Sequence, residues 1–408
     1  MTELQETAFP SPWATLWLSP RQTIERIVGR RPTYLVLPLA ALGMVSAFYM
    51  QLVSVGLAAP FDDWRLSLLA LIIAAGFGVI WLYPSALILS WIGLLLGGEA
   101  TARQLRAVLA WSTVPAILGS AVTLAVLLLL KSAGGGSIVP DKALPWFGAA
   151  FALWTAIVFM LMLGRIEQFG FLRTIVASVA YVSSNLLLAL FVALPVRILF
   201  YQPFSTPAAS MLPTMMVGDN FFVSKFAYGY SRFSLPLGLP LFSGRVFGRE
   251  PRRGDVVVFR LPKDQQTDYV KRVVGLPDER IQMKGGVLYI NDVPAKREPL
   301  TDFVGEACGT DKTARVKRWR ETLPNGASYE TLDCVDNGFY DNTGVFTVPA
   351  GHYFMLGDNR DNSTDSRVLS AVGYIPFENL IGRVDLIFFS RAPGSGEVRS
   401  DRIGTVVR

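Results

Sequence analysis

The sequence is poor in residues that hold metal ions. Its 408 residues include one histidine, His352, and two cysteines, Cys308 and Cys334. Histidine-rich sites, four-cysteine zinc sites and iron–sulfur clusters all need more ligands of these types. We therefore expect no metal site of these kinds.

Charge is also scarce, and it is unevenly distributed. Lys, Arg, Asp and Glu make up 17% of the chain, and only 20 of these 70 residues precede position 201. The net charge of +6 is dispersed along the chain, which argues against nucleic acid as a partner. A first half with little charge and a charged second half predict a membrane domain followed by a water-soluble domain.

Five apolar stretches in the first half are each long enough to cross a bilayer, which takes about 20 residues. The second contains Pro84, and neither side of this proline would span alone, so we expect one tilted or kinked helix. Residues 12–29 mix apolar and charged side chains, as in an interfacial amphipathic helix or a solvated lead-in. The expected spans are Tyr34–Leu57, Leu68–Leu96, Ala107–Leu130, Trp146–Leu163 and Ile175–Phe200.

Basic residues beside these spans predict the orientation. With a cytoplasmic N-terminus, the inside segments carry eight arginines and the outside loops carry three basic residues, Arg65, Lys131 and Lys142. This distribution agrees with the positive-inside rule. Five crossings then place the second half outside the cytoplasmic (inner) membrane. Because disulfides form in such compartments, Cys308 and Cys334 are predicted to pair, with two separate buried thiols as the alternative.

The second half has the pattern of a mainly-β domain. Short β-branched runs such as Asp255–Phe259, Tyr269–Val274 and Arg383–Phe389 alternate with Gly and Pro. Residues from about 302 to 343 show little periodicity and indicate an insertion. The expected organisation is a cytoplasmic lead-in (1–32), a five-span α-helical membrane domain (33–200), a mainly-β extracytoplasmic domain (201–391) and a polar tail (392–408).

Four clusters of the second half offer candidates for nucleophilic catalysis, at residues 202–214, 253–259, 268–277 and 357–367. A serine needs a base to become a nucleophile. His352 directly precedes an apolar run and is interpreted as a strand-entry residue, and no serine has a lysine three positions later.

A lysine distant in the sequence therefore remains as a candidate base. A lysine acts as a base only when it is neutral, and burial favours the neutral form because desolvation penalises the ammonium. Lys271 suits this role, since strand alternation puts it on one face with Tyr269 and Val273.

The four clusters, in this order, resemble the signature motifs of bacterial type I signal peptidases, the membrane-bound Ser–Lys leader peptidases. The resemblance covers about residues 200–391 and is most specific in Gly357-Asp-Asn-Arg-Asp-Asn-Ser-Thr-Asp-Ser-Arg367. It implies that Ser210 is the nucleophile and Lys271 the general base. It also implies that Ser363 orients the lysine, that Asp365 and Arg367 form a supporting ion pair, and that the substrate pockets are lined by Phe204, Thr206, Met215 and Val270.

The sequence departs from this family at three points. Ala208 stands where many members carry a serine whose hydroxyl helps to form the oxyanion hole, and Asp278-Glu279 replace a usual Gly-Asp. The membrane half is larger than the family's one to three anchoring segments. This half is similar to the Yip-like multispanning family, on the basis of Phe9-Pro-Ser-Pro12 and Gly97-Gly-Glu-Ala-Thr-Ala-Arg-Gln-Leu-Arg106.

The resemblance implies a membrane-bound serine endopeptidase that removes signal peptides from exported preproteins on the outer face of the cytoplasmic membrane, without metal or organic cofactor. Its implied partners are preproteins, the lipid bilayer and the secretion channel. Two alternatives remain open. One is a Ser–Lys protease dedicated to one substrate, which the extra membrane domain favours. The other is a non-catalytic membrane scaffold, which the joint presence of Ser210, Lys271, Ser363 and Asp365 disfavours.

Overall fold

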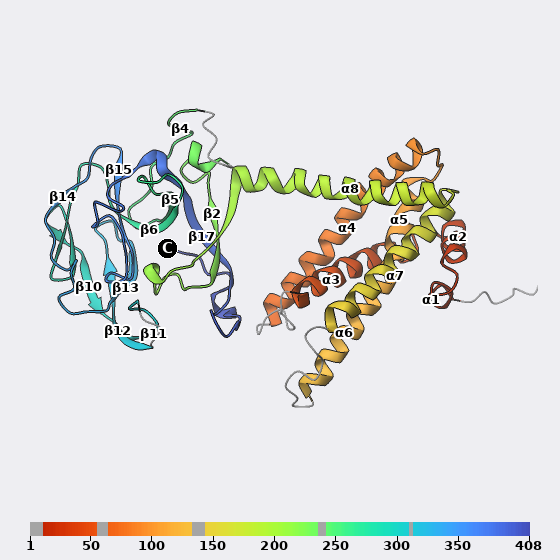
Figure 1. The fold of residues 1–408 in the computed structure, drawn as a ribbon, viewed down its shortest axis with the longest axis horizontal. Coiled ribbons are helices and arrows are strands. Elements are labelled where there is room, and N and C mark those ends of the chain that lie inside the picture. Colours follow the sequence, from red (N-terminus) through yellow and green to blue (C-terminus); the bar gives the residue numbers. More distant parts are fainter. Residues whose placement is uncertain (1–10, 55–63, 133–142, 236–241, 310–312) are drawn as a thin grey trace, which may run out of the picture. The chain divides into compact units, whose positions relative to one another are not determined.

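The computed structural model describes residues 11–54, 64–132, 143–235, 242–309 and 313–408. Two residues of the Phe9–Pro12 motif and part of the expected lead-in lie outside these ranges. The chain divides into a helical unit, Met1–Phe191, and a β unit, Val192–Arg408. We describe each unit by itself (Figure 1).

The helical unit is a bundle in which α3 packs against α4 and α6, and α5 packs against α4 and α7 (Figure 1). Its core is centred on the fully buried Trp111, whose indole N–H donates to the Tyr34 carbonyl oxygen at 3.0 Å. The helices are α1 (Pro12–Thr15), α2 (Pro20–Arg30), α3 (Val36–Ser54), α4 (Trp64–Leu95), α5 (Ala102–Ser112), α6 (Val114–Ser132), α7 (Ala143–Ile166) and α8 (Phe171–Pro195).

The described helices include five segments that are long and apolar enough to cross a membrane, as the sequence predicts. They are Val36–Val53, Ser67–Leu95, Ala102–Leu129, Trp146–Ile166 and Phe171–Phe200. Pro84 lies inside the continuous helix α4. The third segment differs from the expected single helix, because it is divided into α5 and α6 at Thr113. Pro115 explains this division, since proline has no N–H to donate and is tolerated in the first turn of a new helix.

The residues before the first span form helices that pack on the bundle. Leu16, Ile24 and Ile27 are buried in the same core as Trp111, and α2 packs against α7. Residues 12–29 are therefore not a plain solvated lead-in, because Leu16, Ile24 and Ile27 are covered by the bundle, whereas Leu18 is 90% exposed. An interfacial helix stays a prediction.

The β unit is built on an antiparallel seven-stranded sheet. Its order is β1-β2-β17-β5-β6-β15-β16. Both faces of this sheet are buried, since Val256 and Val258 of β5 belong to one hydrophobic core and Val257 and Phe259 to another. The strands are β1 (Tyr201–Ser205), β2 (Asp219–Ser224), β5 (Val256–Arg260), β6 (Asp268–Gly275), β15 (His352–Leu356), β16 (Ile375–Pro376) and β17 (Leu380–Ser390).

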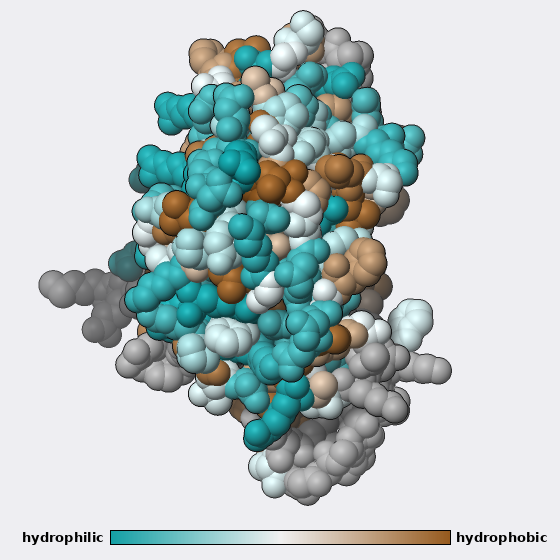
Figure 2. Space-filling view, turned by 90° about the vertical axis from the view of Figure 1, so that its left-hand side faces the viewer, coloured by the Kyte–Doolittle hydropathy of each residue, from teal (hydrophilic) through white to brown (hydrophobic). Residues whose placement is uncertain are grey.

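Smaller sheets complete the β unit. The face of the molecule that Figure 2 shows is covered mainly by hydrophilic side chains. One sheet has the order β14-β7-β8-β9, another has β10-β12-β11 with β13 paired to β12, and a third pairs β3 with β4. These strands are β3 (Tyr230–Ser231), β4 (Arg245–Val246), β7 (Arg280–Lys284), β8 (Val287–Ile290), β9 (Val293–Pro294), β10 (Lys296–Pro299), β11 (Phe303–Gly305), β12 (Ala314–Thr322), β13 (Ser328–Asp333) and β14 (Phe346–Thr347).

The region from about 302 to 343, which shows little periodicity in the sequence, contains a regular antiparallel hairpin, β12–β13. Its strands are dense in charged side chains, so the alternation of apolar and polar residues is weak there. A disulfide between Cys308 and Cys334, with Cα atoms 5.7 Å apart, joins the segment before β12 to the residue after β13.

The segment 392–408, expected as a polar tail, folds back on β17. Val407 is buried, and the backbone N–H of Val407 donates to the Asp385 carbonyl oxygen at 3.0 Å. Arg402 donates through Nη2 to the carboxylate of the fully buried Asp219 at 2.5 Å. The charge of this segment is therefore used in part to neutralise a buried carboxylate.

Candidate active site

Ser210 lies in a short 3-10 helix, Ala209–Met211, five residues after the end of β1. β1 pairs with β2, and the backbone N–H of Thr206 continues this ladder by donating to Asp219 O at 2.8 Å. Met211 is buried in the core below the sheet, which fixes the turn, whereas Ser210 itself stays partly exposed. The chain thus presents the Ser210 hydroxyl at the edge of a rigid sheet.

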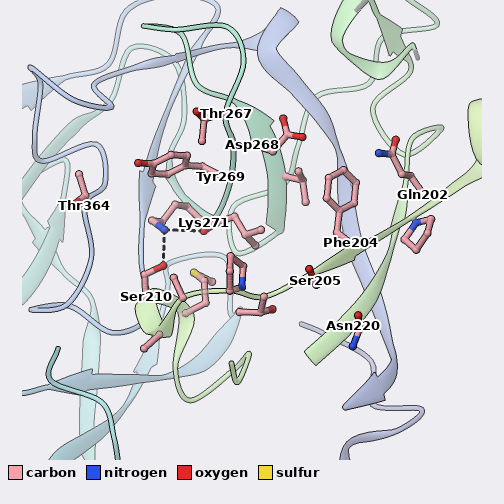
Figure 3. A pocket seen from close by; sticks show the side chains of 18 of the residues that line it. Gln202, Phe204, Ser205, Ser210, Asn220, Thr267, Asp268, Tyr269, Lys271 and Thr364 are labelled. Carbon is pink, nitrogen blue, oxygen red and sulfur yellow. Dashed lines mark hydrogen bonds between the residues drawn. The ribbon is translucent and has the colours of Figure 1, made fainter. Parts of the chain in front are cut away.

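Lys271 meets this hydroxyl from strand β6. Its Nζ donates to Ser210 Oγ at 2.7 Å and to the Val270 carbonyl oxygen at 2.9 Å (Figure 3). The residue is only 4% exposed, and the ring of Tyr269 lies 5.4 Å from Nζ. The alternation of β6 thus places Tyr269 beside the ammonium, as the sequence predicts.

The environment of Lys271 favours its neutral form. Burial lowers the pKa of Lys271 to about 8, although the negative charges of Asp365 and Asp358 act in the opposite direction. A substantial fraction of this lysine is therefore neutral at mildly alkaline pH. A neutral amine at hydrogen-bond distance from a serine hydroxyl can accept its proton.

Asp365 and Arg367 form an ion pair behind the lysine, in the loop 357–367. Arg367 donates through Nε to Asp365 Oδ1 and through Nη2 to Oδ2, both at 2.8 Å, and both side chains are buried. Burial alone would raise the pKa of Asp365, but the charge of Arg367 and its hydrogen bonds outweigh this effect and lower it. Asp365 therefore stays ionised close to Lys271.

Ser363 lies in the same loop but does not orient Lys271 by a hydrogen bond in this structure. Its Oγ is buried and makes no hydrogen bond of normal geometry to a described residue, although the interaction of this hydroxyl with the Asp365 carboxylate helps to lower the pKa of Asp365. The hydroxyl instead fills the space above Gly357, where an added Cβ would lie 2.1 Å from Ser363 Oγ and 2.6 Å from Ser210 O. Only glycine fits at position 357 without displacing Ser363 or the backbone of Ser210.

A cleft of about 790 Å³ opens beside Ser210 and Lys271. Phe204, Thr206 and Val270 line it, as the resemblance implies. Met215 does not belong to its lining, because it lies fully buried in the core against which Phe204 and Val270 pack. Further lining residues were not singled out in the sequence, namely Gln202, Asn220 and Thr364 (Figure 3). Asn362 also lines the cleft.

A second ion pair supports the site and was also missed. Arg272, the neighbour of Lys271, donates to Asp358 Oδ1 and Oδ2 at 2.8 and 2.7 Å, and both side chains are 1% exposed. Thr214 Oγ1 donates to Asp358 Oδ2 at 2.5 Å. The pair joins β6 to the loop 357–367, and Thr214 links it to the turn that follows Ser210. The sequence signal that could have identified Arg272 is its position directly after the candidate base, Lys271.

The other candidate bases lie outside this arrangement. Burial lowers the pKa of Lys225 to about 8, but its Nζ donates to the carbonyl oxygen of Ser234 at 2.5 Å. His352 begins β15, and its Nδ1 lies 2.9 Å from the Ala350 carbonyl oxygen. Within the described ranges, no cluster of three or more His, Cys, Asp or Glu side chains could hold a metal ion.

Comparisons with known proteins match the two halves of the chain separately. Residues 179–389 match the family described as "Signal peptidase, peptidase S26", and residues 13–194 match the Yip1 domain. Similar proteins include "Signal peptidase I" of Rickettsia typhi, 46% identical over 49% of this chain and 76% of that protein. "Signal peptidase I" of Rickettsia conorii is 44% identical over 49% of this chain and 75% of that protein.

A solved structure also matches the chain. It is a signal peptidase I from Enterococcus faecalis, 26% identical, which covers 33% of this chain and 97% of that chain with a TM-score of 0.20. The sequence matches confirm the resemblance of each half, a mainly-β peptidase joined to a multispanning membrane domain.

Proposed function

Because the chain belongs to the signal peptidase family, peptidase S26, we propose that it removes signal peptides from exported preproteins through a Ser210–Lys271 dyad. The observation that carries this proposal is the 2.7 Å hydrogen bond between Lys271 Nζ and Ser210 Oγ inside a cleft. Burial of the lysine supports the proposal, because it lowers the pKa of Lys271 to about 8, so that part of the lysine is neutral near physiological pH.

The reaction proceeds through an acyl-enzyme. Neutral Lys271 takes the proton of Ser210, and the resulting oxygen attacks the carbonyl carbon of the scissile peptide bond. The lysine then returns the proton to the leaving amine as the peptide C–N bond breaks. Lys271 next takes a proton from water, and the hydroxide attacks the ester carbonyl carbon. As the ester C–O bond breaks, the Lys271 ammonium returns the proton to Ser210 Oγ and the signal peptide is released.

The remaining site residues hold this pair and receive the substrate. Asp365 and Arg367 fix the loop behind Lys271, and Ser363 keeps the loop packed on Gly357. Phe204 and Val270 give the cleft an apolar wall that fits small side chains before the scissile bond. Larger side chains would overpack such a wall, which commonly costs about 1–3 kcal/mol.

A defined cleavage experiment tests the proposal. The full chain, reconstituted in phospholipid vesicles with a generic exported preprotein, is expected to cut once after an Ala-x-Ala sequence, and mass spectrometry of both products locates the bond. Replacing the alanine before the bond with leucine should slow cleavage about five- to 150-fold. Cleavage that ignores this alanine would favour a protease dedicated to another substrate, and no cleavage would favour the non-catalytic scaffold.

The proposed localisation is the cytoplasmic membrane, with the β unit on the outer face. Five spans and the excess of arginines in the inside segments support it. Reporters fused after Leu130 and after Arg391 are expected to read as external, and a reporter after Gly170 as cytoplasmic. Enzymatic reporters active on only one side of the membrane provide the measurement. A cytoplasmic reading after Arg391 would contradict the odd number of crossings.

Ala208 offers a test of the oxyanion site. It lines the cleft in extended conformation two residues before Ser210, where it supplies no hydroxyl. The backbone N–H of Ser210 can supply one donor to the developing oxyanion. Adding a second donor by Ala208→Ser is expected to raise kcat by up to about tenfold with little change in KM. Steady-state kinetics measure this effect. A large loss of kcat in a folded variant would contradict this picture of the site.

A further inference from the structure

We infer that Glu321 and Tyr329, on the hairpin β12–β13, are positioning residues for the Ser210–Lys271 pair. The inference rests on the proposed function and adds to it a part of the chain that carries no recognised motif. The hairpin supplies a buried polar cluster that touches both the loop 357–367 and the strand that carries Lys271.

The first contact is made by Arg360 of the loop. Its Nη1 and Nη2 donate to Glu321 Oε2 and Oε1 at 3.0 and 2.6 Å. Tyr329 Oη donates to Glu321 Oε1 at 2.6 Å. Glu321 is fully buried, and Arg360 and Tyr329 are 3% and 6% exposed. Because water cannot compete for these groups, each of the three side chains is held in one position.

Arg360 transmits this constraint to the ion pair behind the lysine. Its carbonyl oxygen accepts a hydrogen bond from Arg367 Nη2 at 2.5 Å, and its N–H donates to the Leu332 carbonyl oxygen of β13 at 3.0 Å. Both the side chain and the backbone of Arg360 are thus attached to the hairpin. Arg367 in turn holds Asp365, which lies close to Lys271.

The second contact runs through Arg272, next to Lys271 on β6. The guanidinium of Arg272 stacks on the ring of Tyr329, with Cζ 3.9 Å from the ring centroid. Arg272 also holds Asp358 at the start of the loop through two hydrogen bonds. The ring of Tyr329 therefore contacts Arg272 of β6, the strand that carries Lys271. Its hydroxyl binds Glu321, which in turn holds Arg360 of the loop. Loosening this residue would let the strand and the loop separate and would admit water to Lys271.

Two variants test the inference. Tyr329→Phe keeps the ring below Arg272 but removes the hydroxyl, and Glu321→Gln removes the charge that holds Arg360. Each is expected to lower kcat about tenfold with KM nearly unchanged, because the reacting groups and not the cleft are displaced. Tyr329→Phe retains the Glu321–Arg360 ion pair, so it remains informative if Glu321→Gln does not fold.

Glu330→Gln is the matched control. Glu330 lies on the same hairpin and pairs with Arg318 at 3.3 Å, and both side chains are about one-third exposed. Strand alternation puts Glu330 on the opposite face of β13 from Tyr329. This variant is expected to keep kcat within about twofold of the wild type. A similar loss of kcat in Glu330→Gln would show that the hairpin acts only through stability and would overturn the inference.

The titration of Lys271 gives a readout that does not depend on cleavage. The full chain labelled with [13C]lysine is titrated by NMR, and Lys271→Ala identifies the resonance. Water admitted by Glu321→Gln or Tyr329→Phe should raise the midpoint by about half a pH unit or more. An unchanged midpoint in both folded variants would overturn the inference, even if the wild type failed to cleave a preprotein. Failure of cleavage with a shifted midpoint would count against the proposed function alone.

Discussion

Ser210→Ala and Lys271→Ala are each expected to abolish cleavage, with kcat falling about 10⁴-fold or more. Without Ser210 no oxygen is available to form the acyl-enzyme. Without Lys271 the hydroxyl loses the only side-chain base that the structure places within hydrogen-bond distance of it in the described ranges. Because the two groups act as a unit, the double variant should be no slower than either single variant. Single-turnover cleavage by folded protein provides the measurement.

Lys225→Met is the control for the lysine. Lys225 is as deeply buried as Lys271, and burial lowers its pKa to about 8 as well. A lowered pKa alone therefore does not distinguish these two lysines. Their partners do, since Lys225 donates to the Ser234 carbonyl oxygen, which has no proton to transfer. Lys225→Met should retain most of the activity. Equal losses from the two lysine variants would leave the base unassigned.

The second large effect is expected from pH. Burial lowers the pKa of Lys271 to about 8, and the base works only when neutral. Below this value each unit of pH protonates about nine-tenths of the remaining neutral lysine, so kcat/KM should fall about tenfold per unit. Above it kcat/KM should reach a plateau. A profile of kcat/KM from pH 6 to 10, with a preprotein whose own groups do not titrate there, measures the midpoint.

Two results would contradict this assignment. A flat profile across this range would mean that the titrating base is not Lys271. A midpoint near 10 would mean that Lys271 is as hydrated as a surface lysine during turnover, despite being 4% exposed in the structure. Thermal unfolding measured over the same pH range separates loss of activity from loss of fold.

The helices could be predicted closely from the sequence because a bilayer imposes a length and a composition. Each expected span overlaps the corresponding segment of the structure over most of its length. The division at Thr113 was missed, since Pro115 lies within a stretch that is apolar enough overall to be one span. Hydropathy shows where a chain can cross a membrane, but local backbone geometry decides where a helix stops.

The central strands of the β unit were also predictable, because burial imposes a residue pattern on them. Asp255–Phe259 and Tyr269–Val274 correspond to β5 and β6 within one residue at each end, because β-branched residues of buried strands leave a clear pattern. The hairpin β12–β13 was not predicted. Its contacts include the buried ion pair of Glu321 with Arg360 and a backbone bridge from Leu332 to Asn359. Such contacts leave no periodic pattern in the sequence.

The site was predictable in its residue types and only partly in its contacts. Burial of Lys271 followed from strand alternation, whereas its approach to Ser210, 61 positions earlier, depends on how β1, β2, β17, β5 and β6 are ordered in one sheet. The part expected of Ser363 did not appear as a hydrogen bond to the lysine, because its hydroxyl is packed on Gly357. The supporting contacts of Arg272 and Arg360 arise from tertiary packing alone.

The disulfide between Cys308 and Cys334 has a consequence for the unfolded chain. Ala307 accepts hydrogen bonds from the amide groups of Asn359 and Asn362, and the N–H of Cys334 donates to Asp361 Oδ2. The bridge therefore joins two of the places where the loop 357–367 is attached, across a separation of 26 residues. A covalent link of this size removes conformations from the denatured ensemble, which contributes on the order of 3 kcal/mol to stability. The disulfide thus stabilises the folded loop in part by lowering the entropy of the unfolded chain, in addition to the hydrogen bonds that the loop makes in the folded state.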